Sequence, residues 1–120
     1  MSERQMNDEQ VAAFCLGLPG AREDYKWGGI RVFSVAGNKM FAVMDIAGAG
    51  LSFKVDQDLF AGYVDMPGIR PAPYLARAYW ISVAKPYALG WDALQELLQR
   101  SHQLVVRKLP KRVQVGLLLD

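Results

Sequence analysis

Residues 22–55, REDYKWGGIRVFSVAGNKMFAVMDIAGAGLSFKV, decide the fold class of this chain. β-branched and aromatic residues gather there in short runs, separated by Gly28-Gly29, Gly37-Asn38 and Gly48-Ala49-Gly50, which are residue types that favour tight turns. Strands joined by such short turns pair antiparallel. The stretch therefore predicts a four-stranded meander, with strands at about 22–27, 31–36, 39–46 and 50–55.

Helical patterns lie on both sides of this meander. Asn7 begins a capping-box pattern ahead of apolar residues at helical spacing, and Asp56 is placed as the N-cap of a short second helix. A long amphipathic pattern after Pro86 ends before Pro110. Together these patterns predict helices over about 8–16, 57–65 and 90–108.

Two extended segments complete the predicted architecture. Residues 79–84 predict a fifth strand, whereas Pro71 and Pro73 favour an extended path that cannot form a central strand. Aromatic side chains such as Trp27, Phe41 and Trp80 are expected to be structural core residues rather than platforms for stacking bases. The order of elements predicts an α+β fold, a two-layer sandwich in which an antiparallel sheet packs one face against the N- and C-terminal helices. At 120 residues, the chain has the usual length of one domain, covering 1–120.

Composition indicates a folded protein of the cytoplasm. Hydrophobic residues make up 52% of the chain and charged residues 22%, which excludes the disordered class. No apolar run approaches the roughly 20 residues that span a bilayer, so no membrane partner is expected. Cys15 is the single cysteine, which excludes an intrachain disulfide and a thiolate metal cage.

Residues that could support catalysis are few and scattered. His102 lies in the middle of a predicted helix, and Cys15 lies on the apolar face of another, where burial is the simpler interpretation. Glu23 and Asp24 are adjacent on a predicted strand and so point to opposite faces. We therefore expect a protein that is not an enzyme and has no catalytic, cofactor-binding or metal site.

The charge pattern near the C-terminus is asymmetric. Five basic residues and no acid lie between Arg100 and Val115. A solvated helix end explains such a run, because cations are favourable near a helix C-terminus. A surface that contacts phosphates weakly is the alternative explanation.

The order of several short motifs resembles the MmcQ/YjbR family of small bacterial proteins. None of the motifs is specific alone, but their order and spacing over nearly the whole chain are. They are Leu18-Pro19-Gly20, Trp27-Gly28, Arg31-Val32-Phe33, Gly37-Asn38-Lys39-Met40-Phe41-Ala42, Leu51-Ser52-Phe53-Lys54, Pro71 through Trp80-Ile81, Ser101-His102 and Leu109-Pro110-Lys111-Arg112.

The resemblance implies a CyaY-like two-layer fold but no proven activity, although members are often described as DNA-binding. That description rests on similarity of fold, which is weak support for function. Lys54, Arg77 and Lys111 match basic positions of the family pattern. Tyr74 and Tyr79 stand in a segment where many members carry His and Asn, which puts any polar site there in doubt.

Our leading hypothesis is a non-enzymatic binding domain of the MmcQ/YjbR type that contacts DNA phosphates. The residues expected to make these contacts are Lys54, Arg77, Arg107, Lys108, Lys111 and Arg112. The alternative is a small-ligand or protein-interaction module that uses the aromatic segment Pro73–Trp80. A structural homodimer is a third hypothesis.

Overall fold

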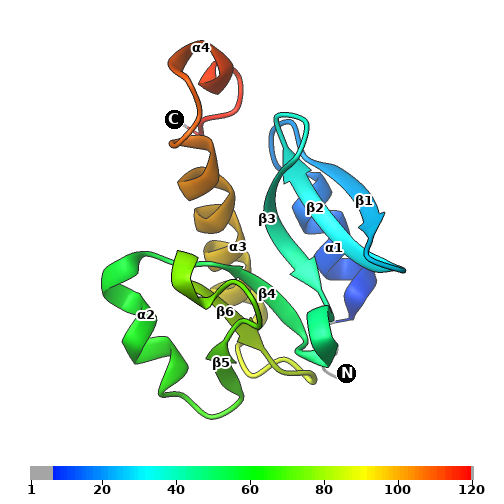
Figure 1. Ribbon diagram of the computed structural model, residues 1–120, viewed down its shortest axis with the longest axis vertical. Helices are drawn as coiled ribbons and strands as arrows, with labels where there is room; N and C mark the ends of the chain where they lie inside the picture. Colours follow the sequence, from blue (N-terminus) through cyan, green and yellow to red (C-terminus); the bar gives the residue numbers. More distant parts are fainter. Residues whose placement is uncertain (1–6, 120) are drawn as a thin grey trace.

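The computed structural model describes residues 7–119, which form an α+β fold around one antiparallel sheet (Figure 1). Neighbouring strands follow the order β1-β2-β3-β4-β6-β5. The elements, in chain order, are α1 (Asp8–Leu16), β1 (Arg22–Lys26), β2 (Ile30–Val35), β3 (Lys39–Met44), the 3-10 turn η1 (Ile46–Gly48), β4 (Leu51–Lys54), α2 (Gln57–Val64), β5 (Ile69–Pro71), the 3-10 turn η2 (Ala76–Ala78), β6 (Trp80–Val83), α3 (Trp91–Val106) and α4 (Lys111–Gln114).

The predicted meander is confirmed, and the sheet gains a sixth strand. β1 to β4 pair antiparallel in sequence order, and β6 pairs with β4 where the fifth strand was expected. The additional strand, β5, pairs only with β6 and forms the edge of the sheet. An edge strand tolerates Pro71 because one side of it needs no ladder hydrogen bond. The prolines excluded a central position for this segment, as predicted, but not a position in the sheet.

Three element boundaries differ from the predicted ones. β3 ends at Met44 because Asp45 adopts a left-handed φ of 63° and leads into η1. α3 ends at Val106, two residues before the predicted end, although it is the longest helix of the described chain, as expected. Beyond the last predicted helix, Lys111 and Arg112 begin the short additional helix α4, for which Pro110 is the N-cap.

The main core lies between the sheet and two helices, α1 and α3, which share one of its faces (Figure 1). Phe33, Phe41 and Phe53 project from three neighbouring strands and are fully buried. Phe41 was predicted to be structural, and its burial confirms this. The N-terminus of α1 has the predicted capping box, in which the side chains and backbones of Asn7 and Gln10 bond reciprocally. No helix within residues 7–119 is long and apolar enough to cross a membrane.

The opposite face of the sheet is only partly covered. A second apolar cluster forms there around Val32, Val43 and Trp80, and residues 72–79 cross over it. Trp80 is 5% exposed, which confirms its predicted structural role. Because no long helix covers this face, the side chains around the cluster border solvent, and both candidate sites described below lie beside it.

Candidate functional site

Three lysines surround a small depression beside this second cluster. Lys39 begins β3, Lys54 ends β4, and Lys108 follows the last turn of α3. The depression has a volume of about 240 Å³, and its apolar lining comes from Trp80, Val105 and Leu109. We call this site, with its three lysines, the basic depression.

A buried serine fixes α3 against the strands that carry these lysines. Ser101 is fully buried, and its Oγ donates to the carbonyl of Phe41 at 2.7 Å. The same oxygen accepts the backbone N–H of Lys54 at 2.9 Å. One α3 side chain therefore holds both β3 and β4, and the next two turns of the helix lead to Lys108.

The ammonium groups of the basic depression have no acidic counterpart. Within residues 7–119, no carboxylate lies within ion-pair distance of Lys39, Lys54 or Lys108. The Lys54 Nζ donates instead to the carbonyl oxygen of Ala78 at 2.5 Å. Burial, and secondarily the charge of Lys108, lower the pKa of Lys54. A nearby anion would oppose both effects, because it favours the charged ammonium and so raises the pKa.

The other cations of the predicted site lie around this depression or beyond it. Arg77 is exposed in η2, next to the residue whose carbonyl Lys54 binds. Arg107 follows α3, and Lys111 and Arg112 lie on α4; all three are exposed. The structure thus brings Lys54 and Lys108 together, places Arg77 beside them, and leaves the remaining three at the C-terminal end of the fold (Figure 1).

Two residues change the predicted picture of the basic run. Arg100 forms a two-pronged ion pair with Asp56, at 2.9 and 3.2 Å. Asp56 occupies the predicted N-cap position of α2 but makes no capping hydrogen bond there. The basic run between Arg100 and Val115 therefore contains no acid in its sequence, but the fold brings one acid, Asp56, next to it. Lys39 was missing from the predicted site, although its place directly after the Gly37-Asn38 turn put it at a strand end.

An apolar groove of about 470 Å³ lies on the same face of the sheet. Two exposed rings border it: Trp27 is 60% exposed and Tyr74 is 88% exposed. The other lining residues are Ile30, Met40, Ile46, Ala47 and Leu75. Trp27, Ala47 and Tyr74 all have φ between 49° and 69°, a left-handed conformation that is costly for residues other than glycine. We call this site the aromatic groove.

The aromatic segment Pro73–Trp80 serves two purposes. Its C-terminal part is structural, because Trp80 is buried and Tyr79 packs edge-to-face on Phe60 with ring centres 5.7 Å apart. Its N-terminal part supplies Tyr74 and Leu75 to the groove. Sequence analysis treated Trp27 as a core residue, and no local signal distinguished it from the buried tryptophan.

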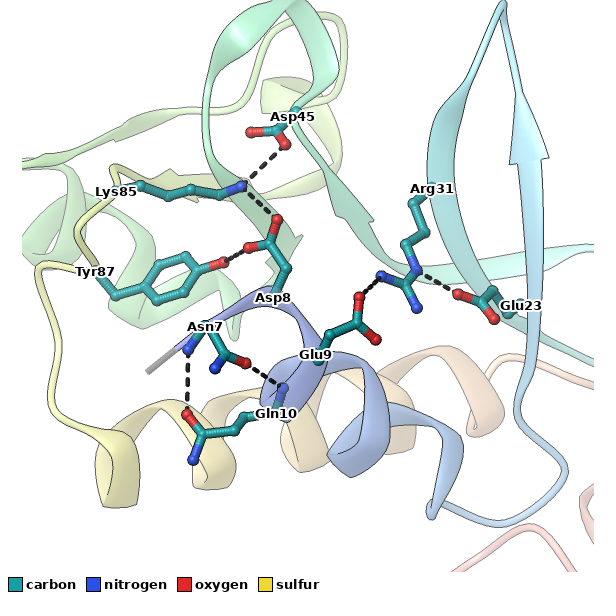
Figure 2. Close-up of polar contacts among 9 residues, drawn as sticks. All are labelled: Asn7, Asp8, Glu9, Gln10, Glu23, Arg31, Asp45, Lys85 and Tyr87. Carbon is teal, nitrogen blue, oxygen red and sulfur yellow. Dashed lines mark hydrogen bonds and ion pairs between the residues drawn. The ribbon is translucent and has the colours of Figure 1, made fainter. Parts of the chain in front are cut away.

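A third polar cluster lies at the N-terminus of α1, and its charges neutralise one another (Figure 2). The Lys85 Nζ binds Asp8 and Asp45, each at 2.9 Å, and the Tyr87 hydroxyl donates to Asp8 at 2.8 Å. Burial opposes ionisation of Asp8, but the hydrogen bonds of Lys85 and Tyr87 outweigh it and lower its pKa. Burial alone would lower the pKa of Lys85. Its hydrogen bonds to the two carboxylates have the larger effect, so the pKa is raised.

A second ion-pair chain continues this cluster along α1. Arg31 bridges Glu9 and Glu23, and Figure 2 shows its guanidinium between the two carboxylates. Hydrogen bonding to Glu9, and then to Glu23, raises the pKa of Arg31. Charges paired in this way hold α1 against β1, β2 and the segment after β6. We call the residues drawn in Figure 2 the paired cluster.

The histidine and the cysteine considered for catalysis are buried. His102 stacks edge-to-face on Phe41, while its ring nitrogens bond the Pro19 carbonyl at 2.8 Å and the Gln103 amide at 2.9 Å. Burial lowers the pKa of His102, against the effect of the Pro19 bond. Burial also raises the pKa of the Cys15 thiol to about 12. Among residues 7–119, no three His, Cys, Asp or Glu side chains are placed to hold a metal ion.

Comparison with known proteins places this fold in a family. The YjbR family model matches residues 16–104. A Deinococcus radiodurans protein, DR2400, with a DUF419 domain, superposes with a TM-score of 0.82 and 25% sequence identity, covering 98% of this chain and 91% of its own. A Pseudomonas syringae protein solved as a structural-genomics target gives a TM-score of 0.69 at 25% identity, covering 83% and 99%.

No curated protein sequence matches the chain. The family model nevertheless spans most of it, from the end of α1 into the second half of α3. The implied likeness to CyaY stays a prediction, whereas the resemblance to MmcQ/YjbR proteins is confirmed. The chain belongs to the YjbR family.

Proposed function

We propose that this protein binds nucleic-acid phosphates through the basic depression and acts without catalysis. The observation that carries the proposal is the convergence of Lys39, Lys54 and Lys108, from three separate elements, with no carboxylate partner among residues 7–119. Partly burying an ammonium group beside a second one costs free energy unless an anion is supplied. A phosphate oxygen supplies that charge and accepts hydrogen bonds from lysine.

The arrangement of the outlying cations favours a polymer over a single small anion. Arg77 is the neighbour of Ala78, whose carbonyl accepts the Lys54 ammonium, and Arg107, Lys111 and Arg112 continue from the end of α3 onto α4. A chain of phosphates can contact several such positions at once, whereas one anion occupies only the central lysines. Phosphate contacts of this kind position a nucleic acid without reading its sequence.

The test is the salt dependence of DNA binding, measured by fluorescence anisotropy with a short labelled oligonucleotide, both as a duplex and as a single strand. If the lysines of the basic depression neutralise about three phosphates, log affinity against log salt should have a slope of about −3 for the duplex and about −2 for the single strand. In the double variant Lys54→Gln/Lys108→Gln, the duplex slope should flatten to about −1.

The matched control is Lys54→Arg/Lys108→Arg, which keeps both charges and should keep the slope. A second control is the far-UV circular dichroism of each variant, which should match that of the wild type. The proposal is wrong if neither form of DNA binds in a salt-dependent way at low ionic strength. It is also wrong if the glutamine variant binds with the wild-type slope.

A further inference from the structure

We infer that the nucleic acid bound by this protein is single-stranded, with an unpaired base held in the aromatic groove between Trp27 and Tyr74. The inference rests on the proposed function and names its ligand class. Both rings border one apolar groove of about 470 Å³ and stay largely exposed to solvent. Exposed aromatic rings beside a groove provide stacking surfaces for a base of any sequence.

The backbone at the groove is held in a costly conformation. Trp27 and Tyr74 have φ of 49° and 69°, and neither ring is buried in compensation. Bulky residues adopt this region rarely, and such outliers concentrate at binding sites. Both residues line the groove, and neither belongs to the buried core.

The groove and the basic depression are neighbours. Residues 72–80 pass from one to the other, because Leu75 lines the groove while the Ala78 carbonyl accepts the Lys54 ammonium. Trp80 lines the depression and belongs to the same apolar cluster as Met40, a groove residue. A strand whose phosphates contact the lysines can therefore place a nearby base over the groove.

Base pairing determines whether a nucleic acid can place a base in the aromatic groove. In a duplex, each base is stacked and paired, so it reaches a protein groove only after extrusion, which costs free energy. A single strand offers its bases at once, and its phosphates remain available to the basic depression. A site that combines an apolar aromatic groove with flanking lysines therefore complements a single strand better than a duplex.

The experiment compares three probes of equal length: a single strand, the same single strand with its central nucleotides abasic, and the duplex. Wild-type protein should bind the normal strand most tightly, with a quench of Trp27 fluorescence. Trp27→Gly and Tyr74→Gly should each weaken binding of the normal strand by about fivefold to a hundredfold, and should change binding of the abasic strand much less. Glycine is chosen because it removes the ring and adopts the left-handed backbone freely.

The matched control is Tyr25→Ala, which removes another exposed ring, 61% exposed, from outside the groove. It should leave the affinity unchanged. Equal affinity for the normal and abasic strands, or wild-type affinity in both glycine variants, overturns the inference and leaves phosphate binding intact. An apolar peptide or small molecule would then be the better occupant of the groove. If no probe binds with salt dependence, the proposed function itself fails, and this inference fails with it.

Discussion

The paired cluster and the basic depression differ in whether their cations have carboxylate partners. In the paired cluster, Lys85 contacts two carboxylates and Arg31 contacts two more, so each cation is matched by acids of the same chain. In the basic depression, the Lys54 ammonium donates to a backbone carbonyl, and burial, with a smaller effect from the charge of Lys108, lowers its pKa. Within residues 7–119, the fold pairs the first set of cations with carboxylates and leaves the second set without one.

The paired cluster has a structural role that the basic depression does not share to the same extent. The paired cluster ties the start of α1 to β2, to the end of β3 and to the segment after β6, so its ion pairs stabilise the fold. The basic depression makes no equivalent tie between elements through its ammonium groups, apart from the bond of Lys54 to η2. Removing a cation should therefore have different consequences in the two regions.

The largest expected effect concerns the apolar floor of the basic depression. Trp80→Ala removes a buried ring and should cost about 3–5 kcal/mol of unfolding free energy. The matched variant Trp27→Gly removes an exposed ring and should cost less than about 1 kcal/mol. Urea denaturation measures both. If the Trp80→Ala protein were as stable as the wild type, the Trp80 ring would not be packed as a buried core residue beneath the depression.

The next effect concerns His102, a buried group that the fold satisfies in its neutral form. Its pKa is lowered in the folded state, so the unfolded chain binds the proton more readily as the pH falls below about 6.5. Stability should therefore decrease between about pH 7 and pH 5, by at most about 1.4 kcal/mol per pH unit for one proton. Urea denaturation at several pH values checks this.

His102→Gln provides the control for this pH dependence. The variant removes the titrating ring, so its stability, though lower, should change less over the same pH range. Asp8 does not interfere, because a carboxyl group with a lowered pKa loses its stabilising effect only below about pH 4. An unchanged pH dependence in the variant would assign the effect to another group.

The smallest effect tests the comparison itself. Lys85→Met removes the cation between Asp8 and Asp45 and should cost about 1 kcal/mol, or about 4 °C in melting temperature, because these pairs are partly exposed. Lys54→Met removes a cation that has no acidic partner in the described chain, and should leave the melting temperature unchanged or slightly higher. Equal losses in the two variants would mean that both lysines are structural.

Sequence alone predicted the elements that depend on local signals. The glycine turns predicted the meander, and the capping box at Asn7 predicted the start of α1. The edge strand β5 was not predicted, because prolines exclude a central strand but are compatible with an edge strand. The helix α4 was not predicted, because its four residues are too few to show a periodic pattern.

The candidate site was less predictable because it depends on contacts between distant segments. Lys54 and Lys108 were expected from the family pattern and from the basic run, but Lys39 joins them only through the packing of β3 beside α3. The Asp56 partner of Arg100 lies 44 residues away in sequence. Composition and periodicity indicate neither the exposure of Trp27 nor its left-handed φ.

The most direct test of unmatched charge in the basic depression is the pKa of Lys54, measured by NMR on protein with 13C-labelled lysine side chains. The NMR signal of Lys54 is identified by its absence from the spectrum of a Lys54→Arg sample. The DNA strand contains only adenine and cytosine, because the other bases lose protons at high pH. In the free protein, the pKa should lie below the usual lysine value of about 10.4, and saturation with the strand should raise it. A pKa that does not change when the strand is bound would contradict the account, because Lys54 would then not be contacting its phosphates.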